Sequence, residues 1–580
     1  MTKSIGPVTG GGEAVRRDLT SSAGGPGLEL STRASTPGAA ASHQGQDHTA
    51  TVDRADLGTF DGRADLPRQN DDVGKGGLMT AQRVAVEPCV VSSPPQAPPT
   101  RAHRPGAHVR PNRAWSRGRL PLGVLGIILG CLLAWRAALH SGLFDDVFWH
   151  LAAGQWMLSH HAVLRRDVFS YTVRGHSWTT PEWGYDVVLA EAVHLVGPVA
   201  FWLLSAGLAS LTVLAVAVRS RILGAGWTWT GLLSLEVGAA VTLLLDDRPQ
   251  MVSYLLLALL LLILTLARRK TAWLWSLPVI FVIWANMHGS FLLGLAVVAL
   301  DVILAIVPVR LGRLSAGNPL KPIPALASFG GAVLATLFNP FGIGVYASAL
   351  GVTFNSSISQ IIEEWQSPNF HNSSILLVFI IPVGLMLAYL TFSRRDVPTF
   401  DFVLTVFLLI CTLDAVRFLP YFVVCSCGLA AVCRPSSAEQ WRPTLLTWPL
   451  LVLITISMLA GAWYPAGRAA SSEPVRATDF LEQHPGRVFS TYLWNDYLIS
   501  RRIPVFVDGR TELYTDTPIF REYLAVDQLT VSPDSLLRSY GVEYVLWPSN
   551  SPLSIYLTND RRWRPVWRSR STEVFHYVGG

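Results

Sequence analysis

Residues that could do chemistry stand directly after the first long apolar stretch of the sequence. Asp145 and Asp146 form an acidic pair there, and His150 follows four residues after Asp146. If a helix begins at the pair, Asp146 and His150 lie on one face of it. This spacing suits a carboxylate oriented by an imidazole, and it equally suits two ligands of a divalent ion. The alternative is that Asp146 only complements the dipole at a helix N-terminus.

Other polar residues also stand at the ends of apolar stretches. Asp247 and Arg248 end one stretch, and there the guanidinium could bind a phosphate while the carboxylate faces a cavity. The alternative is a solvated Asp–Arg pair. His288 stands between two later stretches, either near the same surface or as an ordinary interface residue. Glu364 belongs to a long connection, and its alternative is a solvated loop.

Arg417 begins a later apolar stretch, where an unpaired cation is costly. It therefore needs an anionic partner, which is either Asp414 or a ligand. The C-terminal region adds the run Asp508-Gly509-Arg510. Acidic residues at a membrane boundary must stay solvated or find partners, because an unpaired buried charge is unfavourable. The gathering of these residues on one side predicts a shared water-filled cavity.

The apolar stretches themselves indicate a polytopic membrane protein. Half of the 580 residues are apolar and only 15% are charged, and the apolar residues come in long blocks. About eleven blocks approach the roughly 20 residues that a transmembrane helix needs. We expect these helices at Leu120–Leu139, Pro198–Val218, Trp227–Leu245, Met251–Ala267, Trp273–Met287, Ser290–Pro308, Pro324–Phe338, Ile375–Phe392, Phe400–Leu413, Phe418–Val432 and Leu445–Trp463.

Basic residues recur in every second connection between these blocks, and this alternation predicts the orientation of the chain. The connections are Arg219–Arg221, Arg268–Lys270, Arg310–Lys321, Arg394–Arg395 and Arg434–Arg442. Because cytoplasmic loops carry the excess of Arg and Lys, the N-terminus is expected in the cytoplasm and the C-terminal region outside it. The net charge of +6 is explained by these loops, so we expect no nucleic acid partner.

Composition divides the chain into three expected regions. Residues 1–117 are rich in Gly, Ser, Thr and Pro and are expected to be a disordered cytoplasmic region. Residues 118–463 form the transmembrane domain, with a first outer loop at 141–192. Residues 464–580 are expected to form a small extracytoplasmic α/β domain. Its strand-like runs are Arg487–Tyr492, Ile503–Val507 and Tyr540–Trp547.

The acidic pair after the first apolar stretch resembles the signature of the GT-C superfamily of membrane glycosyltransferases. This superfamily includes protein O-mannosyltransferases, lipid A aminoarabinose transferases and oligosaccharyltransferase catalytic subunits. The first loop, with Phe144–His150, Phe169-Ser170 and Trp178–Trp183, is similar to the first loop of the superfamily. The run Tyr492–Tyr497 does not match the Trp-Trp-Asp tripeptide of oligosaccharyltransferases, which favours a simpler monosaccharide transferase.

The resemblance implies a GT-C-like fold over about residues 120–580 and an enzyme of the cell envelope that works in the lipid bilayer. Its donor would be a polyprenyl-phosphate-linked sugar, displaced directly by an acceptor hydroxyl on the extracytoplasmic side. Asp145 or Asp146 would be the catalytic base. The substrate-binding residues would be His150, Asp247, Arg248, His288, Glu364 and Arg417. A divalent metal ion is an open candidate as cofactor, and the sequence specifies neither sugar nor acceptor.

Two other functions use the same features. A lipid or solute transporter, or flippase, would pass its substrate through the polar cavity, although alternating access favours a site near the membrane midplane and repeated halves. A non-catalytic envelope assembly protein would act through its exported C-terminal region. In such a protein, substituting both Asp145 and Asp146 would have no effect.

Overall fold

The computed structural model describes residues 122–140, 145–243, 248–309, 311–315, 317–353, 362–392, 396–432, 474–514 and 517–579. The expected N-terminal region, 1–117, and the last expected span, Leu445–Trp463, lie outside these residues. The elements of the described part, with 3-10 helices marked η, are α1 (Leu122–His140), α2 (Asp145–His160), α3 (Trp183–Val196), α4 (Val199–Ile222), α5 (Trp227–Leu243), α6 (Gln250–Ala267), η1 (Thr271–Ser276), α7 (Leu277–Met287), α8 (Phe291–Ile306), β1 (Leu314–Ser315), α9 (Pro322–Ala335), α10 (Gly344–Thr353), η2 (Glu363–Trp365), α12 (Ser373–Phe392), β2 (Val397–Pro398), α13 (Thr399–Asp414), η3 (Val416–Phe418), α14 (Leu419–Val432), α16 (Val475–Gln483), β3 (Val488–Ser490), α17 (Tyr492–Ser500), η5 (Thr511–Leu513), α18 (Ile519–Asp527), α19 (Pro533–Ser539), β4 (Tyr544–Pro548), α20 (Pro552–Asn559), β5 (Trp563–Arg568) and β6 (Thr572–Tyr577).

Apolar helices coincide with each expected span before residue 433, from α1 to α14. Three described helices, α4, α6 and α12, are long and apolar enough to cross a membrane. Others are shorter: the 17 residues of α5 make a rod of about 26 Å, whereas the hydrocarbon core is roughly 30 Å thick. The chain thus has helices suited to span a membrane, but the count of about eleven is not confirmed.

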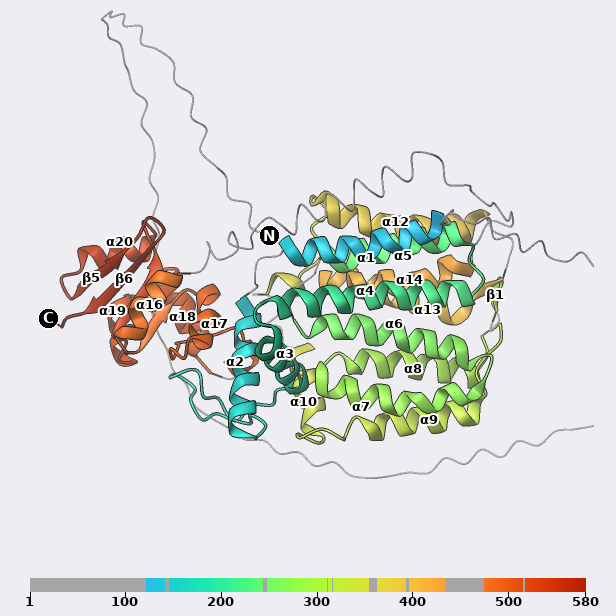
Figure 1. Ribbon diagram of the computed structural model, residues 1–580, viewed down its shortest axis with the longest axis horizontal. Helices are drawn as coiled ribbons and strands as arrows, with labels where there is room; N and C mark the ends of the chain where they lie inside the picture. The colour runs from blue at the N-terminus through green and yellow to red at the C-terminus, as the bar shows by residue number, and fades with distance from the viewer. Residues whose placement is uncertain are drawn as a thin grey trace, which may run out of the picture. The chain divides into compact units, whose positions relative to one another are not determined.

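Glycines bring α1 and α5 into backbone contact, and the two helices lie side by side (Figure 1). A Cβ added at Gly126 would lie 2.5 Å from the carbonyl oxygen of Gly231, and one at Gly130 would lie 2.5 Å from that of Ser234. Gly126 and Gly130 form a small-xxx-small repeat, which allows the close approach of two apolar helices. In a bilayer such van der Waals contact, rather than the hydrophobic effect, holds helices together.

Two ion pairs tie the C-terminal ends of α4 and α6 to other helices. Arg219 Nη2 lies 2.5 Å from Asp401 Oδ1 of α13, and Arg268 Nη2 lies 2.7 Å from Asp301 Oδ1 of α8. Gly428 of α14 faces the first pair, and a Cβ there would collide with the Arg219 guanidinium and the Asp401 carboxylate. A glycine at this position therefore makes room for a buried ion pair between three helices.

Helices α2 and α3 run across one end of the apolar helices (Figure 1). α3 contacts α4 and α7, while α2 contacts α3 on one side and α17 on the other. At the second contact, the rings of Phe148 and Tyr497 meet edge to face, with centroids 5.1 Å apart. The helix that begins with the acidic pair is thus held between the apolar helices and the C-terminal residues.

The described C-terminal residues, 474–579, here called the tail, contain a four-stranded sheet with the order β3-β4-β6-β5. β3 is parallel to β4, and the other neighbours are antiparallel. Two of the three expected strand runs contain β3 and most of β4. The third, Ile503–Val507, was expected as a strand and is not one, because Val505 forms only isolated bridges with Val488 and with Ser170 of the first loop.

The tail and the first loop share one hydrophobic core. Trp149 and Trp178 of the loop are buried together with Phe489 and Phe506 of the tail. The rings of Phe489 and Phe506 pack with centroids 5.2 Å apart, and those of Trp149 and Trp178 with centroids 5.7 Å apart. Burial of such large apolar rings from both segments holds the tail against α2.

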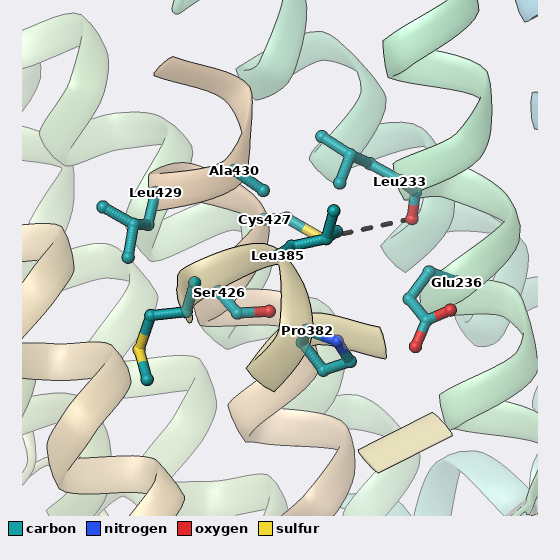
Figure 2. Close-up of a pocket in the computed structure, with 9 residues that line it drawn as sticks. Leu233, Glu236, Pro382, Leu385, Ser426, Cys427, Leu429 and Ala430 are labelled. Carbon is teal, nitrogen blue, oxygen red and sulfur yellow. Dashed lines mark hydrogen bonds between the residues drawn. The ribbon is translucent and has the colours of Figure 1, made fainter. Parts of the chain in front are cut away.

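A small cavity lies among α5, α12 and α14, lined by residues such as Leu385, Ser426 and Cys427 (Figure 2). Glu236 of α5 borders it, and its Oε1 has no hydrogen-bond partner among the described residues. The cavity has room for about one water molecule. It contains none of the residues singled out in the sequence.

Candidate functional site

Asp146 lies in the first turn of α2, and its carboxylate contacts an arginine from a distant part of the chain. Arg248, two residues before α6, places Nη1 3.1 Å from Asp146 Oδ2. The same Nη1 lies 2.8 Å from Oε1 of Glu364 in η2. One guanidinium nitrogen therefore joins carboxylates from two other elements. The three side chains are 23–26% exposed, so this cluster borders solvent.

A second carboxylate, from the tail, lies beside Asp146. Asp496 of α17 accepts a hydrogen bond from the backbone N–H of Gly509 at 2.9 Å. A Cβ added at Gly509 would lie 2.6 Å from Asp496 Oδ2 and would also collide with Asp146 Oδ1. It would lie 3.2 Å from Nε1 of Trp149, a buried donor that has no hydrogen-bond partner among the described residues. Two carboxylates and an indole N–H thus converge on one glycine.

The environment of Asp146 makes it a stronger base than a solvated aspartate. Burial raises its pKa, and the negative charges of Glu364 and Asp508 raise it further, while Arg248 acts in the opposite direction. A base is most effective when its pKa lies near the working pH. The adjacent guanidinium meanwhile favours the ionised form that can accept a proton.

A buried charge network fixes Gly509 against Asp146. Arg510 is fully buried, and its Nε and Nη2 donate to the two carboxylate oxygens of Asp508 at 2.9 and 2.6 Å. Nη2 also donates to Oδ1 of Asp167, in the first loop, at 2.6 Å. The guanidinium lies over the ring of Trp178, 4.6 Å from its centroid. Because such a network leaves an uncompensated charge if one member is removed, it firmly joins the tail to the loop.

His150 is buried and does not pair with Asp146, so the partnership expected from their spacing is wrong. Its Nδ1 lies 2.6 Å from Oδ1 of Asp186 in α3. The physical reason is that α3 packs on α2 and brings a buried carboxylate closer than the one four residues away. Burial lowers the pKa of His150 and raises that of Asp186, so both are held toward their neutral forms.

His288 follows α7 and lies among hydroxyl groups. Its Nδ1 is 2.9 Å from Ser253 Oγ and accepts a hydrogen bond from the backbone N–H of Ser290 at 3.2 Å. The proton of the neutral ring is therefore on Nε2. Burial and the charge of Arg417 lower the pKa of His288 to about 3, so it is a neutral hydrogen-bonding group rather than a cation.

Arg417, in η3, has no carboxylate partner among the described residues. Its guanidinium lies over the ring of Trp365, 4.1 Å from the centroid, and its Nη2 is 3.4 Å from Oε1 of Gln250. The alternative that Asp414 is its partner is therefore wrong. Trp365 directly follows Glu364 in η2, so Arg417 borders the Asp146 cluster with its charge still available to an anion.

Glu182, which precedes α3, is a further carboxyl group close to these charges. Burial and the neighbouring Glu512 raise its pKa to about 8, while Arg417 lowers it. At pH 7 it mostly holds its proton. It therefore adds a neutral hydrogen-bonding group, not another negative charge, to this end of the helices.

The described residues do not fit a divalent metal ion. Among them, no group of three or more His, Cys, Asp or Glu side chains is placed to hold one. Asp146 and Glu364 could share an ion, but the Nη1 atom of Arg248 stands between them.

Of the residues expected to form the site, Asp146, Arg248 and Glu364 are in direct contact. Asp247 and the side chain of Asp145 lie outside the described residues. The two histidines occupy separate hydrogen-bond networks, and the arginine of η3 borders the central cluster.

Sequence reasoning missed Asp496, Asp186 and Glu182. Asp496 lies in the run Tyr492–Tyr497, which drew notice only because it fails to match a known tripeptide. An acidic residue flanked by aromatic residues in the tail is a usable signal. No local pattern, however, pairs it with a residue of the first loop.

Comparisons with known proteins give matches among solved structures only. No protein-family model matches the chain, and no curated protein matches it. The archaeal oligosaccharyltransferase AglB from Archaeoglobus fulgidus, in complex with an inhibitory peptide and a dolichol-phosphate, is 11% identical, with a TM-score of 0.48. That match covers 73% of this chain and 69% of AglB.

Two further matches are of the same kind. ArnT from Cupriavidus metallidurans, bound to undecaprenyl phosphate, is 13% identical with a TM-score of 0.45, over 78% of this chain and 97% of ArnT. Arabinofuranosyltransferase AftD from Mycobacteria is 13% identical with a TM-score of 0.42, over 80% of this chain and 40% of AftD. At these identities and TM-scores the likenesses carry no argument about the function or the residue roles of this chain.

Proposed function

We propose that the chain is a membrane glycosyltransferase that moves a sugar from a polyprenyl-phosphate donor to an acceptor hydroxyl on the extracytoplasmic side. The observation that carries the proposal is a carboxylate cluster at one end of the apolar helices, with a second arginine close to it. Asp146 is held by Arg248. Arg417 lies over the ring of Trp365, next in sequence to Glu364, and has no carboxylate partner among the described residues.

These charges suit the two ends of a direct displacement. The donor lies with its polyprenyl chain among the apolar helices and its sugar–phosphate bond at their polar end. The acceptor oxygen attacks the anomeric carbon and loses its proton to Asp146. The bond between that carbon and the phosphate oxygen breaks, and the phosphate leaves with the electron pair. Arg417 stabilises the charge that develops on it.

The arrangement also favours Asp146 over its neighbours as the base. Asp186 is buried with His150 and held toward its neutral form. Glu182 mostly holds its proton at pH 7. Asp146 has a raised pKa, an adjacent guanidinium that favours its ionised form, and a partly exposed side chain that an acceptor can reach. Asp145 is the second candidate, since it belongs to the same acidic pair.

The test compares Asp146→Asn and Asp145→Asn, alone and together, with the wild type. Transfer of labelled sugar from polyprenyl-phosphate donors to acceptor is measured in proteoliposomes with matched amounts of folded protein. Asp146→Asn should lower transfer by roughly 10²–10⁴-fold. The control is Asp479→Asn, which alters an exposed carboxylate paired with Arg501 in the tail and should keep the wild-type rate.

Full transfer by both single variants and the double variant would rule out the acidic pair as the base. A wild type that moves a lipid or a solute across the bilayer, and never transfers sugar, would replace the proposal with the transporter.

A further inference from the structure

We infer that Arg248 is a built-in substitute for a divalent cation, holding Asp146 and Glu364 together where a metal ion would otherwise bridge them. The catalytic role of Arg248 rests on the proposed function. Whether Arg248 takes the place of a metal ion can be tested without any sugar donor.

The geometry is that of a bridging ion. A single atom, Nη1 of Arg248, lies 3.1 Å from Asp146 Oδ2 and 2.8 Å from Glu364 Oε1. The three side chains come from α2, from the segment before α6, and from η2. In this arrangement one positively charged nitrogen already contacts both carboxylates.

A metal ion and this guanidinium exclude each other. Divalent ions bind carboxylate oxygens at about 2.0–2.6 Å, so an ion shared by Asp146 and Glu364 would lie in nearly the same place as the Arg248 nitrogen. Two cations at that separation repel strongly. Since an ion can be held by one or two carboxylates together with water, Asp146 and Glu364 would suffice if the guanidinium were absent.

A fixed cation is needed here because negative groups crowd the position. Glu364 and Asp508 both act on Asp146 to disfavour its charged form, and Arg248 opposes them. Without a positive centre, close carboxylates cannot all stay ionised. Arginine supplies that centre permanently, since its guanidinium does not lose its proton in proteins. The site then needs no metal ion to favour the ionised form of Asp146 and to hold its carboxylate in place.

The first measurement uses the unaltered protein. After treatment with EDTA, the wild type should keep its melting temperature and its transfer rate, and Mn²⁺ titration followed by electron paramagnetic resonance should show no stoichiometric binding. Stoichiometric Mn²⁺ binding that Asp146→Asn or Glu364→Gln abolishes would overturn the inference, whether or not the protein transfers sugar.

The second measurement removes the guanidinium. Arg248→Ala and Arg248→Gln should lose transfer at least tenfold and gain saturable Mn²⁺ binding, with a higher melting temperature in Mn²⁺. Adding Glu364→Gln to either variant should abolish the new binding. Folded Arg248 variants that bind no more Mn²⁺ than the wild type would overturn the inference.

Arg562→Ala is the matched control for loss of an arginine that joins two acids. Arg562 bridges Asp534 and Asp560 in the tail, and neither acid belongs to the Asp146 cluster, so this variant should keep the transfer rate. If no preparation transfers sugar but the Mn²⁺ results are as expected, the proposed function fails and the inference about Arg248 stands.

Discussion

Replacement of Gly509 by alanine should disable transfer while leaving the fold in place. The new Cβ would lie 2.6 Å from Asp496 Oδ2, whereas an ordinary contact begins at 3.4 Å, so that oxygen must retreat by about 0.8 Å. Asp146 Oδ1, which the Cβ would also meet, must move at least as far. The buried Asp508–Arg510 pair prevents the backbone from yielding instead.

A shift of this size at the base is large for catalysis and small for stability. Misplacement of a reacting group by about 1 Å can lower a rate by as much as 10²-fold, so we expect Gly509→Ala to lose roughly 10- to 100-fold. Overpacking by one methyl group costs about 1–3 kcal/mol, which should appear as a modest fall in melting temperature.

The assay is sugar transfer in proteoliposomes, with thermal melting measured on the same preparations. Gly207→Ala in α4 is the matched control, because nothing lies within 4 Å of a Cβ there. It should keep both the rate and the melting temperature. If Gly509→Ala transfers sugar at the wild-type rate, then Gly509 does not lie against Asp146 and the assigned position of the base is incorrect.

Two further predictions concern a carboxyl group and a glycine. Glu182→Gln should keep transfer near wild type at pH 7, because this carboxyl has a pKa of about 8 and already holds a proton. Since the folded chain keeps that proton where the unfolded chain, with a pKa of 4.5, has lost it, wild-type stability should fall as pH rises from about 5 to 8. The melting temperature of the variant should fall less, and equal slopes would contradict the raised pKa. Gly428→Ala should destabilise the protein by about 1–3 kcal/mol, because its Cβ would collide with the Arg219–Asp401 pair. Thermal melting in detergent checks this, transfer per folded molecule should not change, and an unaltered melting temperature would show that the pair can move freely.

The helices could be located from the sequence, whereas the core between loop and tail could not. A long apolar run that ends at charged residues, as α6 ends before Arg268, has one simple interpretation in a membrane protein. Trp149 and Trp178 allow two interpretations, because an aromatic residue near a bilayer can be an interfacial anchor or a core residue. Only the folded chain shows them buried with Phe489 of the tail.

The candidate site divides in the same way. Asp146 could be found because its position after the first apolar stretch is a local feature. The partner of Asp146 could not be predicted, because local spacing favours His150. The actual partner is Arg248, and its position depends on how the apolar helices pack and bring a distant segment close. The approach of Asp496 depends on the packing of α17 on α2, which no period or motif in the sequence encodes.

The bond between Asp167 and Arg510 determines when, during synthesis of the chain, the candidate site can form. The two residues are 343 positions apart, so the bond can form only after nearly the whole chain has been synthesised. Asp167 leaves the ribosome early, and Arg510 follows only after all the described apolar helices. Until Arg510 is in place, the buried pair that fixes Gly509 against Asp146 is incomplete. A chain released before residue 510 therefore carries its acidic pair without the backbone that encloses it.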